Sequence, residues 1–149
     1  MKKLLVLHGP NLNYLDKREP SIYGTTTLAE IDASLMDYGQ KLGYQVTCFQ
    51  SNHEGALVDQ IYEVDEAGFA GIIFNPGAYT HTSIALRDCI EAVAIPVIEV
   101  HLSNIYAREP FRHHSFISAV AVGQILGFGA FGYQMAIDAI NNFIKEQKK

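Results

Sequence analysis

The sequence predicts an α/β fold in which helices cover both faces of a parallel sheet. Short, continuous apolar runs alternate along the chain with longer segments whose apolar residues recur at helical spacing. With 149 residues, of which 48% are hydrophobic, the chain has the size and composition of one globular domain, residues 1–149. It contains no internal repeat, low-complexity tract or interdomain linker, so we expect βαβ units joined in series.

Five segments are predicted to be strands. Leu4–Leu7 and Gly71–Phe74 are unbroken apolar runs, closed by Gly9-Pro10 and by Asn75-Pro76-Gly77, as expected for strands buried on both faces. The other three are β-prone segments at 44–50, 96–101 and 124–128. Five such units in a chain of this length indicate a flavodoxin-like three-layer sandwich with strand order 2-1-3-4-5.

Four helices are predicted between and after these strands. Thr27-x-x-Glu30 forms a capping box at the start of the first helix, whose apolar positions run to Leu42. A second helix is expected from about Glu54 to Asp65. Two further segments have apolar residues at helical spacing: Leu86, Cys89, Ile90 and Val93 in the third helix, and Tyr133, Ile137, Ile140, Phe143 and Ile144 in the last.

Charge and cysteine content exclude several classes of function. The net charge is −5, and no run of Lys and Arg could form a basic face, so we expect no nucleic-acid partner. Cys48 and Cys89 have neither Cys-x-x-Cys nor zinc-site spacing and are expected to be reduced thiols. No segment approaches the roughly 18 apolar residues of a membrane span, and the first apolar run is too short for a signal peptide. We therefore expect no membrane contact and a cytoplasmic protein.

The segment from His8 to about Thr26 is a candidate lid, because strand-to-helix connections usually take only about 2–6 residues. It follows a strand at the carboxyl edge of the sheet, where open α/β sheets bind ligands, and we interpret residues 13–25 as the lid. A plain surface loop is the alternative. Within it, Arg18 could lower the pKa of Tyr23 and let the phenolate act as a base, although a lone loop tyrosine is usually only packed.

A second candidate is the pair Glu99 and His101. The two lie two residues apart on a predicted strand, so their side chains point to the same face. A carboxylate beside an imidazole can fix its tautomer and raise its proton affinity, which suits a general acid. A structural pair is the alternative. Ser103-Asn104 follows directly and could hold a substrate carboxylate.

The glycines from Gly127 to Gly132 match Gly-x-Gly-x-x-Gly between a strand and a helix. A dinucleotide site would also need a second strand and an acidic residue about 20 positions later, and the chain ends within one helix. Tight packing of strand against helix explains these glycines better. The histidines have no metal-ligand spacing, so the sequence indicates no metal site.

Several groups of residues, in order along the chain, resemble the motifs of type II 3-dehydroquinate dehydratases. They are His8-Gly9-Pro10-Asn11-Leu12-Asn13, Arg18-Glu19-Pro20, Tyr23-Gly24, Gln50-Ser51-Asn52-His53-Glu54-Gly55, Asn75-Pro76-Gly77-Ala78-Tyr79-Thr80-His81-Thr82-Ser83 and Glu99-Val100-His101-Leu102-Ser103-Asn104. The segment 123–133 and the last helix are similar too, so the resemblance covers essentially the whole chain. It implies a lyase that dehydrates 3-dehydroquinate to 3-dehydroshikimate without metal or cofactor, by anti elimination through an enolate. This reaction belongs to the shikimate pathway of aromatic amino acid biosynthesis or to quinate catabolism.

The resemblance also implies a role for each site residue. Tyr23, kept ionised by Arg18, would remove a proton from C2, and Asn11 would hold the water or the charge at the enolate oxygen. His101, positioned by Glu99, would protonate the departing C1 hydroxyl. The substrate-binding residues would be Asn75, His81, Leu102, Ser103 and Arg112, with Arg108 near the lid and Asp88 reaching the neighbouring site in a homo-dodecamer built from trimers.

Two residues depart from the family pattern, since Tyr14 and Asp16 stand where Leu and Gly are usual. An Asp in place of Gly restricts the backbone, so we expect altered lid motion rather than altered chemistry. Two other classes of function were weighed. One is a non-catalytic flavodoxin-like module that binds a small carboxylate or nucleotide and has no need of Tyr23 beside Arg18. The other, a flavin or nicotinamide oxidoreductase, is suggested only by the glycine pattern.

Overall fold

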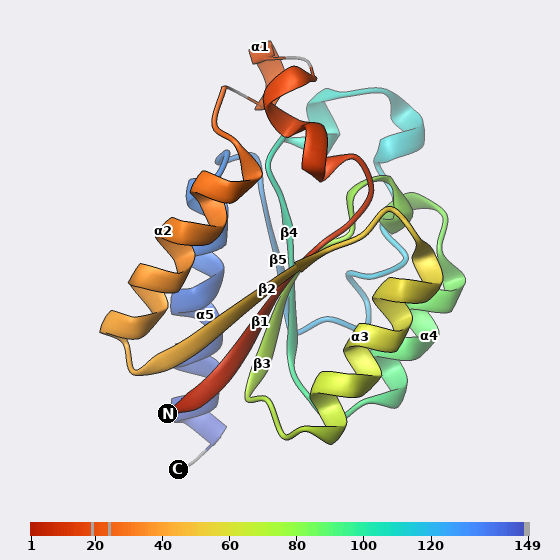
Figure 1. Ribbon diagram of the computed structural model, residues 1–149. Coiled ribbons are helices and arrows are strands. Elements are labelled where there is room, and N and C mark those ends of the chain that lie inside the picture. Colours follow the sequence, from red (N-terminus) through yellow and green to blue (C-terminus); the bar gives the residue numbers. More distant parts are fainter. Residues whose placement is uncertain (19, 24, 148–149) are drawn as a thin grey trace.

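Five parallel strands form one sheet in the order β2-β1-β3-β4-β5, which confirms the predicted fold and strand order (Figure 1). The computed structural model describes residues 1–18, 20–23 and 25–147, except the side chains of residues 22 and 23. The strands are β1 (Lys2–His8), β2 (Tyr44–Gln50), β3 (Gly71–Asn75), β4 (Val97–His101) and β5 (Gly123–Leu126).

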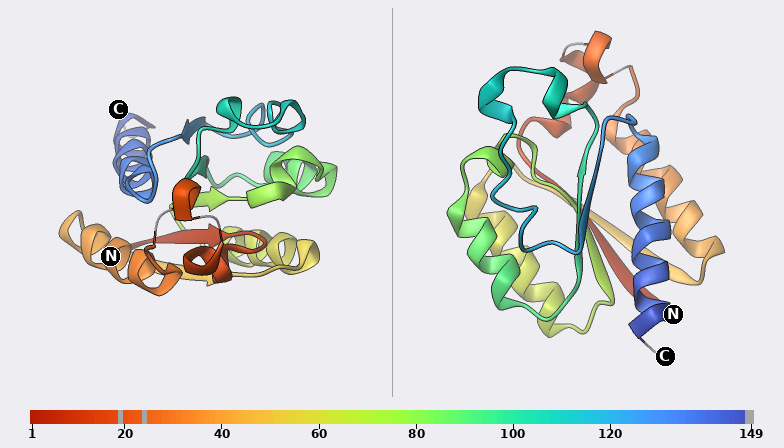
Figure 2. Two further views of the ribbon diagram at one scale, coloured as in Figure 1. Left: turned by 90° about the horizontal axis from the view of Figure 1, so that it is seen from above. Right: turned by 180° about the vertical axis from the view of Figure 1, so that it is seen from behind.

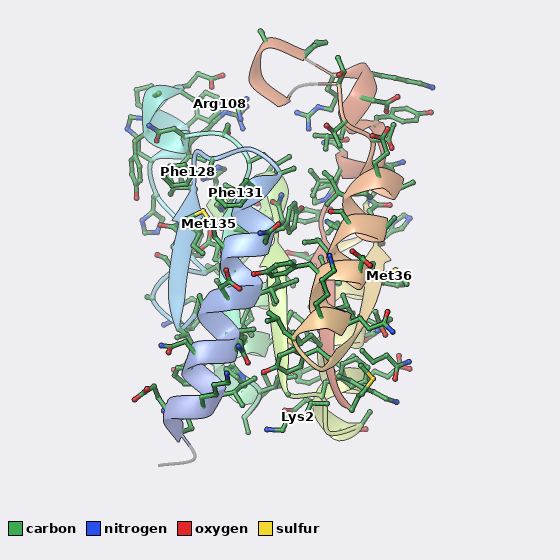
Figure 3. All side chains as sticks on the ribbon, turned by 90° about the vertical axis from the view of Figure 1, so that its left-hand side faces the viewer. Lys2, Met36, Arg108, Phe128, Phe131 and Met135 are labelled. Carbon is green, nitrogen blue, oxygen red and sulfur yellow. The ribbon has the colours of Figure 1, made fainter. Side chains whose placement is uncertain are left out.

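Helices cover both faces of this sheet. α2 (Leu28–Lys41) and α5 (Phe131–Gln147) lie on one face, and α3 (Glu54–Glu66) and α4 (Ile84–Ala92) lie on the other (Figures 1 and 2). In the view onto α2 and α5, Arg108 lies at the carboxyl end of the strands and Lys2 at the opposite end (Figure 3). None of the described helices is long and apolar enough to cross a membrane.

The alternation of side chains along the strands divides the core into two layers. Leu4 and Val6 of β1 belong to the layer under α2 and α5, whereas Leu5 and Leu7 belong to the layer under α3 and α4. All four are fully buried, and burying such a side chain contributes about 1.5–3 kcal/mol. The two layers therefore fix the register of the strands, and with it the positions of their last residues at the carboxyl edge of the sheet.

The ends of some elements differ from the prediction by a few residues. α4 ends at Ala92, and Val93 is its extended cap rather than part of the helix. β5 ends at Leu126 instead of residue 128 because Gly127 has φ +93, which no strand accommodates.

The largest difference lies in the segment after β1, which was predicted as an irregular connection. It contains a 3-10 helix, η1 (Leu12–Lys17), and a short helix, α1 (Pro20–Tyr23). Leu12 and Leu15 of η1 are buried and belong to the core layer under α2 and α5. The first half of the predicted lid is therefore attached to the core through Leu15, and Leu12 anchors the chain directly before the lid.

The segments that follow β1 and β3 touch each other through main-chain atoms. The Gly9 N–H donates to the carbonyl oxygen of Asn75 at 2.7 Å. A Cβ atom on Gly9 would overlap the carbonyl of Pro76, and Gly77 has φ +59 beside Pro10. Glycine at positions 9 and 77 thus allows the two strand ends to cross in direct backbone contact.

Candidate active site

A cleft opens at the carboxyl edge of the sheet, where the predicted site residues were expected. It has about 480 Å³ of space, including its open mouth. Most of the residues singled out from the sequence line it: Asn11, Arg18, Asn75, His81, His101, Leu102, Ser103, Arg108 and Arg112.

Two predicted residues with described side chains, Glu99 and Asp88, do not line the cleft. Glu99 is fully buried behind His101. Asp88 lies on α4 with a side chain that is 64% exposed and is bonded to Arg87 at 3.2 Å. Tyr23 is the last residue of α1, and its side chain lies outside the described part of the chain.

Glu99 and His101 point to the α3/α4 face of β4, as their spacing predicts. Nε2 of His101 is 2.6 Å from Oε2 of Glu99. The hydroxyls of Thr80 and Ser115 donate to the same carboxylate, at 2.5 Å and 2.9 Å from Oε2. Because an ionised carboxylate only accepts hydrogen bonds, Nε2 carries a proton, and Nδ1 is the nitrogen left for a ligand in the cleft.

The charge on Glu99 is held in place by these donors. Burial alone would raise its pKa, but the hydrogen bonds from His101, Thr80 and Ser115 outweigh burial and bring the pKa of Glu99 below its usual value. The carboxylate is therefore ionised at neutral pH. A fixed negative charge in contact with an imidazole compensates a positive charge on that ring, as proton donation by a histidine requires.

The other charged side chains at the cleft are cations. Among the described residues that line it are three arginines, Arg18, Arg108 and Arg112, and no carboxylate. A guanidinium nitrogen of Arg108 donates to the Ser103 hydroxyl at 3.3 Å, and Nε of Arg112 donates to Glu109 at 2.8 Å. Arginines in this arrangement favour an anionic ligand, and their planar donor groups match a carboxylate.

His81 is placed as a neutral partner for a hydroxyl. Burial lowers its pKa, so the ring is uncharged at neutral pH. Its Nδ1–H donates to the carbonyl oxygen of His114 at 2.9 Å, which leaves Nε2 as an acceptor. The ring stacks on His101 with 6.4 Å between centroids.

Asn11 owes its place to an unusual backbone conformation. Its φ of +70 is the only left-handed value among the described non-glycine residues, and asparagine tolerates that region better than most side chains. Its N–H donates to Oδ1 of Asn52 at 2.9 Å. This contact with the segment after β2 holds Asn11 at the rim of the cleft.

Of the glycines at 127–132, Gly127 and Gly129 lie in the turn after β5 and have φ +93 and +62. A Cβ atom on Gly132 would make only ordinary contacts with Val100 and Ile125, so left-handed backbone rather than the predicted tight packing explains Gly127 and Gly129. The Gly127 N–H donates to the carbonyl oxygen of His101 at 3.3 Å, and the Gly129 N–H donates to that of Leu102 at 2.9 Å. These two N–H groups are therefore bonded to the chain itself and are not directed at a dinucleotide phosphate. They hold the turn after β4 against the start of α5.

One group in the described residues has the spacing of a metal site: the ligand atoms of His8, Asp32 and Cys48 lie within 4.8 Å of one another. Both ring nitrogens of His8 are already bonded, to Tyr133 and to Asp32. Burial, followed by the charge of Asp32, raises the pKa of the Cys48 thiol, so the thiolate that binds metals is disfavoured. The group fits a hydrogen-bond network better than a metal site.

Known proteins resemble the chain over nearly its whole length. Residues 2–141 match the family model described as Dehydroquinase class II. The 3-dehydroquinate dehydratase of Ruegeria pomeroyi is 59% identical over 140 residues, covering 94% of this chain and 93% of the relative. The type II dehydroquinase structure from Propionibacterium acnes superposes with a TM-score of 0.92 at 42% identity, covering 95% of this chain and 97% of that one. The one from Butyrivibrio crossotus has a TM-score of 0.92 at 48% identity, covering 94% and 97%.

Proposed function

Because the chain belongs to the class II dehydroquinase family, we propose that the cleft is where it dehydrates 3-dehydroquinate to 3-dehydroshikimate. The observation that carries this location is the Glu99–His101 pair, which meets a cleft whose other charged residues are arginines. A non-catalytic binding module is not favoured, since it has no need of a buried carboxylate behind a histidine.

Tyr23 begins the proposed reaction as a phenolate. It removes a proton from C2, next to the ketone, and the electron pair moves to the ketone oxygen to form an enolate. Arg18 lines the cleft five residues earlier and keeps Tyr23 ionised, because a nearby guanidinium favours the phenolate. Asn11 holds the water molecule or the charge at the enolate oxygen, as donors aimed at a developing charge do.

His101 completes the elimination as the general acid. As the enolate returns to a ketone, its C2 electron pair forms the C1–C2 double bond, and the C1–O bond breaks. The oxygen leaves as water with a proton from His101, while Glu99 positions the ring and compensates its charge. Support for this role comes from the 2.6 Å contact and from Nδ1 being the nitrogen available to the cleft.

The remaining lining residues bind the parts of the substrate that do not react. We assign the substrate carboxylate to the turn at Leu102 and Ser103, beside the guanidinium of Arg108. The ring hydroxyls are assigned to Asn75, His81 and Arg112. We place Arg108 at the edge of the lid, residues 13–25, where it closes over the bound carboxylate.

The working unit is proposed to be a dodecamer built from trimers, in which each 149-residue chain is one catalytic domain. Asp88 would then reach a neighbour's cleft, which accords with its exposed position on α4 away from the cleft of its own chain. We also propose a cytoplasmic location, since Cys48 and Cys89 are free thiols, the form that reducing compartments maintain. A sedimentation mass near that of one chain would overturn the dodecamer.

The deciding experiment is an assay of the purified protein with 3-dehydroquinate in the presence of a metal chelator. The product is a conjugated enone, so its ultraviolet absorbance rises with turnover. We expect a rise with the natural sequence and none with Tyr23→Phe, while both proteins bind the substrate. An exposed tyrosine outside the cleft, Tyr62, gives the control Tyr62→Phe, which should turn over normally. Binding without turnover by the natural sequence would favour the binding module.

A further inference from the structure

A chain of four polar side chains crosses the core from α2 to the cleft, on the sheet face opposite Glu99 and His101. Oδ1 of Asp32 on α2 lies 2.7 Å from Nε2 of His8 at the end of β1. Nδ1 of His8 lies 2.8 Å from the hydroxyl of Tyr133 on α5, and that hydroxyl lies 3.0 Å from Nδ2 of Asn75 at the end of β3. His8 and Tyr133 are fully buried, and Asn75 reaches the cleft.

The direction of every hydrogen bond in this chain is fixed. The Gly77 N–H donates to Oδ1 of Asn75 at 3.0 Å, so the amide nitrogen of Asn75 faces Tyr133 and donates to its oxygen. The hydroxyl proton of Tyr133 is then directed to Nδ1 of His8. In this order of bonds Nδ1 of His8 accepts, and the ring proton lies on Nε2 and is donated to Asp32.

A doubly protonated His8 would break this order. Its Nδ1–H would donate to the tyrosine oxygen, and the hydroxyl proton of Tyr133 would lose its acceptor in a fully buried position. Burial also raises the pKa of Tyr133, so its hydroxyl keeps its proton. The carboxylate of Asp32 thus selects the one tautomer of His8 that accepts from Tyr133.

We propose that Tyr133, His8 and Asp32 are positioning residues that hold the Asn75 amide with its second N–H toward the cleft, where it donates to a ring oxygen of the substrate. The inference rests on the proposed function of the cleft. Without the tyrosine oxygen, the amide could rotate and present its oxygen instead, which would face a substrate hydroxyl with the wrong polarity. The network therefore acts on substrate binding and leaves the proton transfers of Tyr23 and His101 unchanged.

The test compares Tyr133→Phe with Tyr44→Phe. Tyr44 is also buried and donates to α5, to Oδ1 of Asn141 at 2.7 Å, but it lies outside the residues lining the cleft. Each variant loses one hydroxyl that bonds α5 to the sheet: Tyr44→Phe loses the bond to Asn141, and Tyr133→Phe loses the bonds to His8 and Asn75. We expect Tyr133→Phe to raise KM for 3-dehydroquinate about tenfold with kcat within about threefold, and Tyr44→Phe to change neither. A KM for Tyr133→Phe within about twofold of that for Tyr44→Phe would overturn the proposal.

A second measurement reads the network without turnover. In ¹⁵N spectra of the histidine rings, His8 should carry its proton on Nε2, and Asp32→Ala should shift it toward Nδ1. A proton on Nδ1 in the natural sequence would overturn the proposed order of bonds. If the natural sequence failed to convert 3-dehydroquinate, the proposed function would be wrong. The ¹⁵N spectrum would still show whether the hydrogen bonds around His8 have the proposed directions. If it converted the substrate and only the KM effect were missing, the positioning role alone would fail.

Discussion

Two histidines end strands of the same sheet, His8 on β1 and His101 on β4, with β3 between them. Each is bonded to a carboxylate, but the two pairs lie on opposite faces of the sheet, and the histidine is the more deeply buried member in one pair and the carboxylate in the other. In the pair on β4, Glu99 is fully buried and His101 lies between it and the cleft. In the pair on β1, His8 is fully buried and the side chain of Asp32 is 27% exposed.

The order of burial decides what each pair can do. His101 has one nitrogen bonded to Glu99 and the other left for the cleft, so it can exchange a proton with a ligand. Both nitrogens of His8 are bonded inside the protein, so it can only transmit an orientation from Asp32 to Tyr133. In the proposed function, the same two residue types therefore serve proton transfer at one strand end and positioning at the other.

The sharpest test of this difference is to remove the ring that faces the cleft. His101→Ala should lower kcat by about 10²–10⁴, the usual contribution of general acid catalysis. His113, which is exposed and outside the lining of the cleft, provides the control His113→Ala. Steady-state turnover of 3-dehydroquinate measures both, and equal activity of the two variants would remove His101 from the chemistry.

Removing the carboxylates should separate the pairs in stability. Glu99→Ala leaves His101, Thr80 and Ser115 without their acceptor, and breaking a buried pair costs about 3–5 kcal/mol of unfolding free energy. Asp32→Ala should cost only about 1 kcal/mol, because the Asp32 side chain is 27% exposed and water can enter the space that it leaves beside Nε2 of His8. Urea denaturation followed by circular dichroism gives both values. Similar losses would mean that the depth of the carboxylate does not distinguish the pairs.

The pH dependence of stability should reveal the lowered pKa of Glu99. The folded pKa lies below the unfolded value of about 4.3, so the stabilisation is fully present above that value. It is lost as the pH falls through the lower, folded pKa. Glu99→Gln cannot titrate there, so its unfolding free energy should fall less than that of the natural sequence on acidification from pH 7. Parallel denaturation curves at neutral and acid pH would contradict the ionised state assigned to Glu99.

The smallest effect is expected from substitutions in η1, which follows β1 and contains no residue of either histidine–carboxylate pair. Tyr14 packs against Lys17, whose Nζ lies 5.3 Å from the ring centroid, and Asp16 lies in the same turn. Replacing them together, as Tyr14→Leu with Asp16→Gly, should free this backbone and change kcat by a few-fold, with the pH profile unchanged. Unchanged kinetics would show that these two residues do not set the motion of the lid.

The sequence predicts one of the two pairs and misses the other, for a physical reason. Glu99 and His101 share one strand, and a period of two residues is enough to place them on one face. His8, Asp32 and Tyr133 come from β1, α2 and α5, and only the packing of those elements brings them together. Periodicity predicts each element on which they lie but gives no distance between elements.

The same limit applies to the segment after β1. Its length and polar residues predict a ligand-binding connection, but the burial of Leu12 and Leu15 depends on the space left between α2 and the sheet. The strand order, by contrast, agrees with the one predicted from the alternation of strands and helices. The sequence predicts that the glycines at 127 and 129 allow tight packing, but the structure explains them by their positive φ, which periodicity does not reveal. Local patterns thus predict the elements, and contacts between them complete the site.

The backbone crossing at Gly9 and Gly77 has a consequence for directed evolution of this enzyme. Because the two segments meet through main-chain atoms, no larger side chain at either position can be compensated by a smaller one opposite it. A combinatorial library that seeks a new substrate should therefore keep both glycines fixed. Its diversity belongs at lining positions such as Ala78 and Ile105, where side chains alone determine the shape of the cleft.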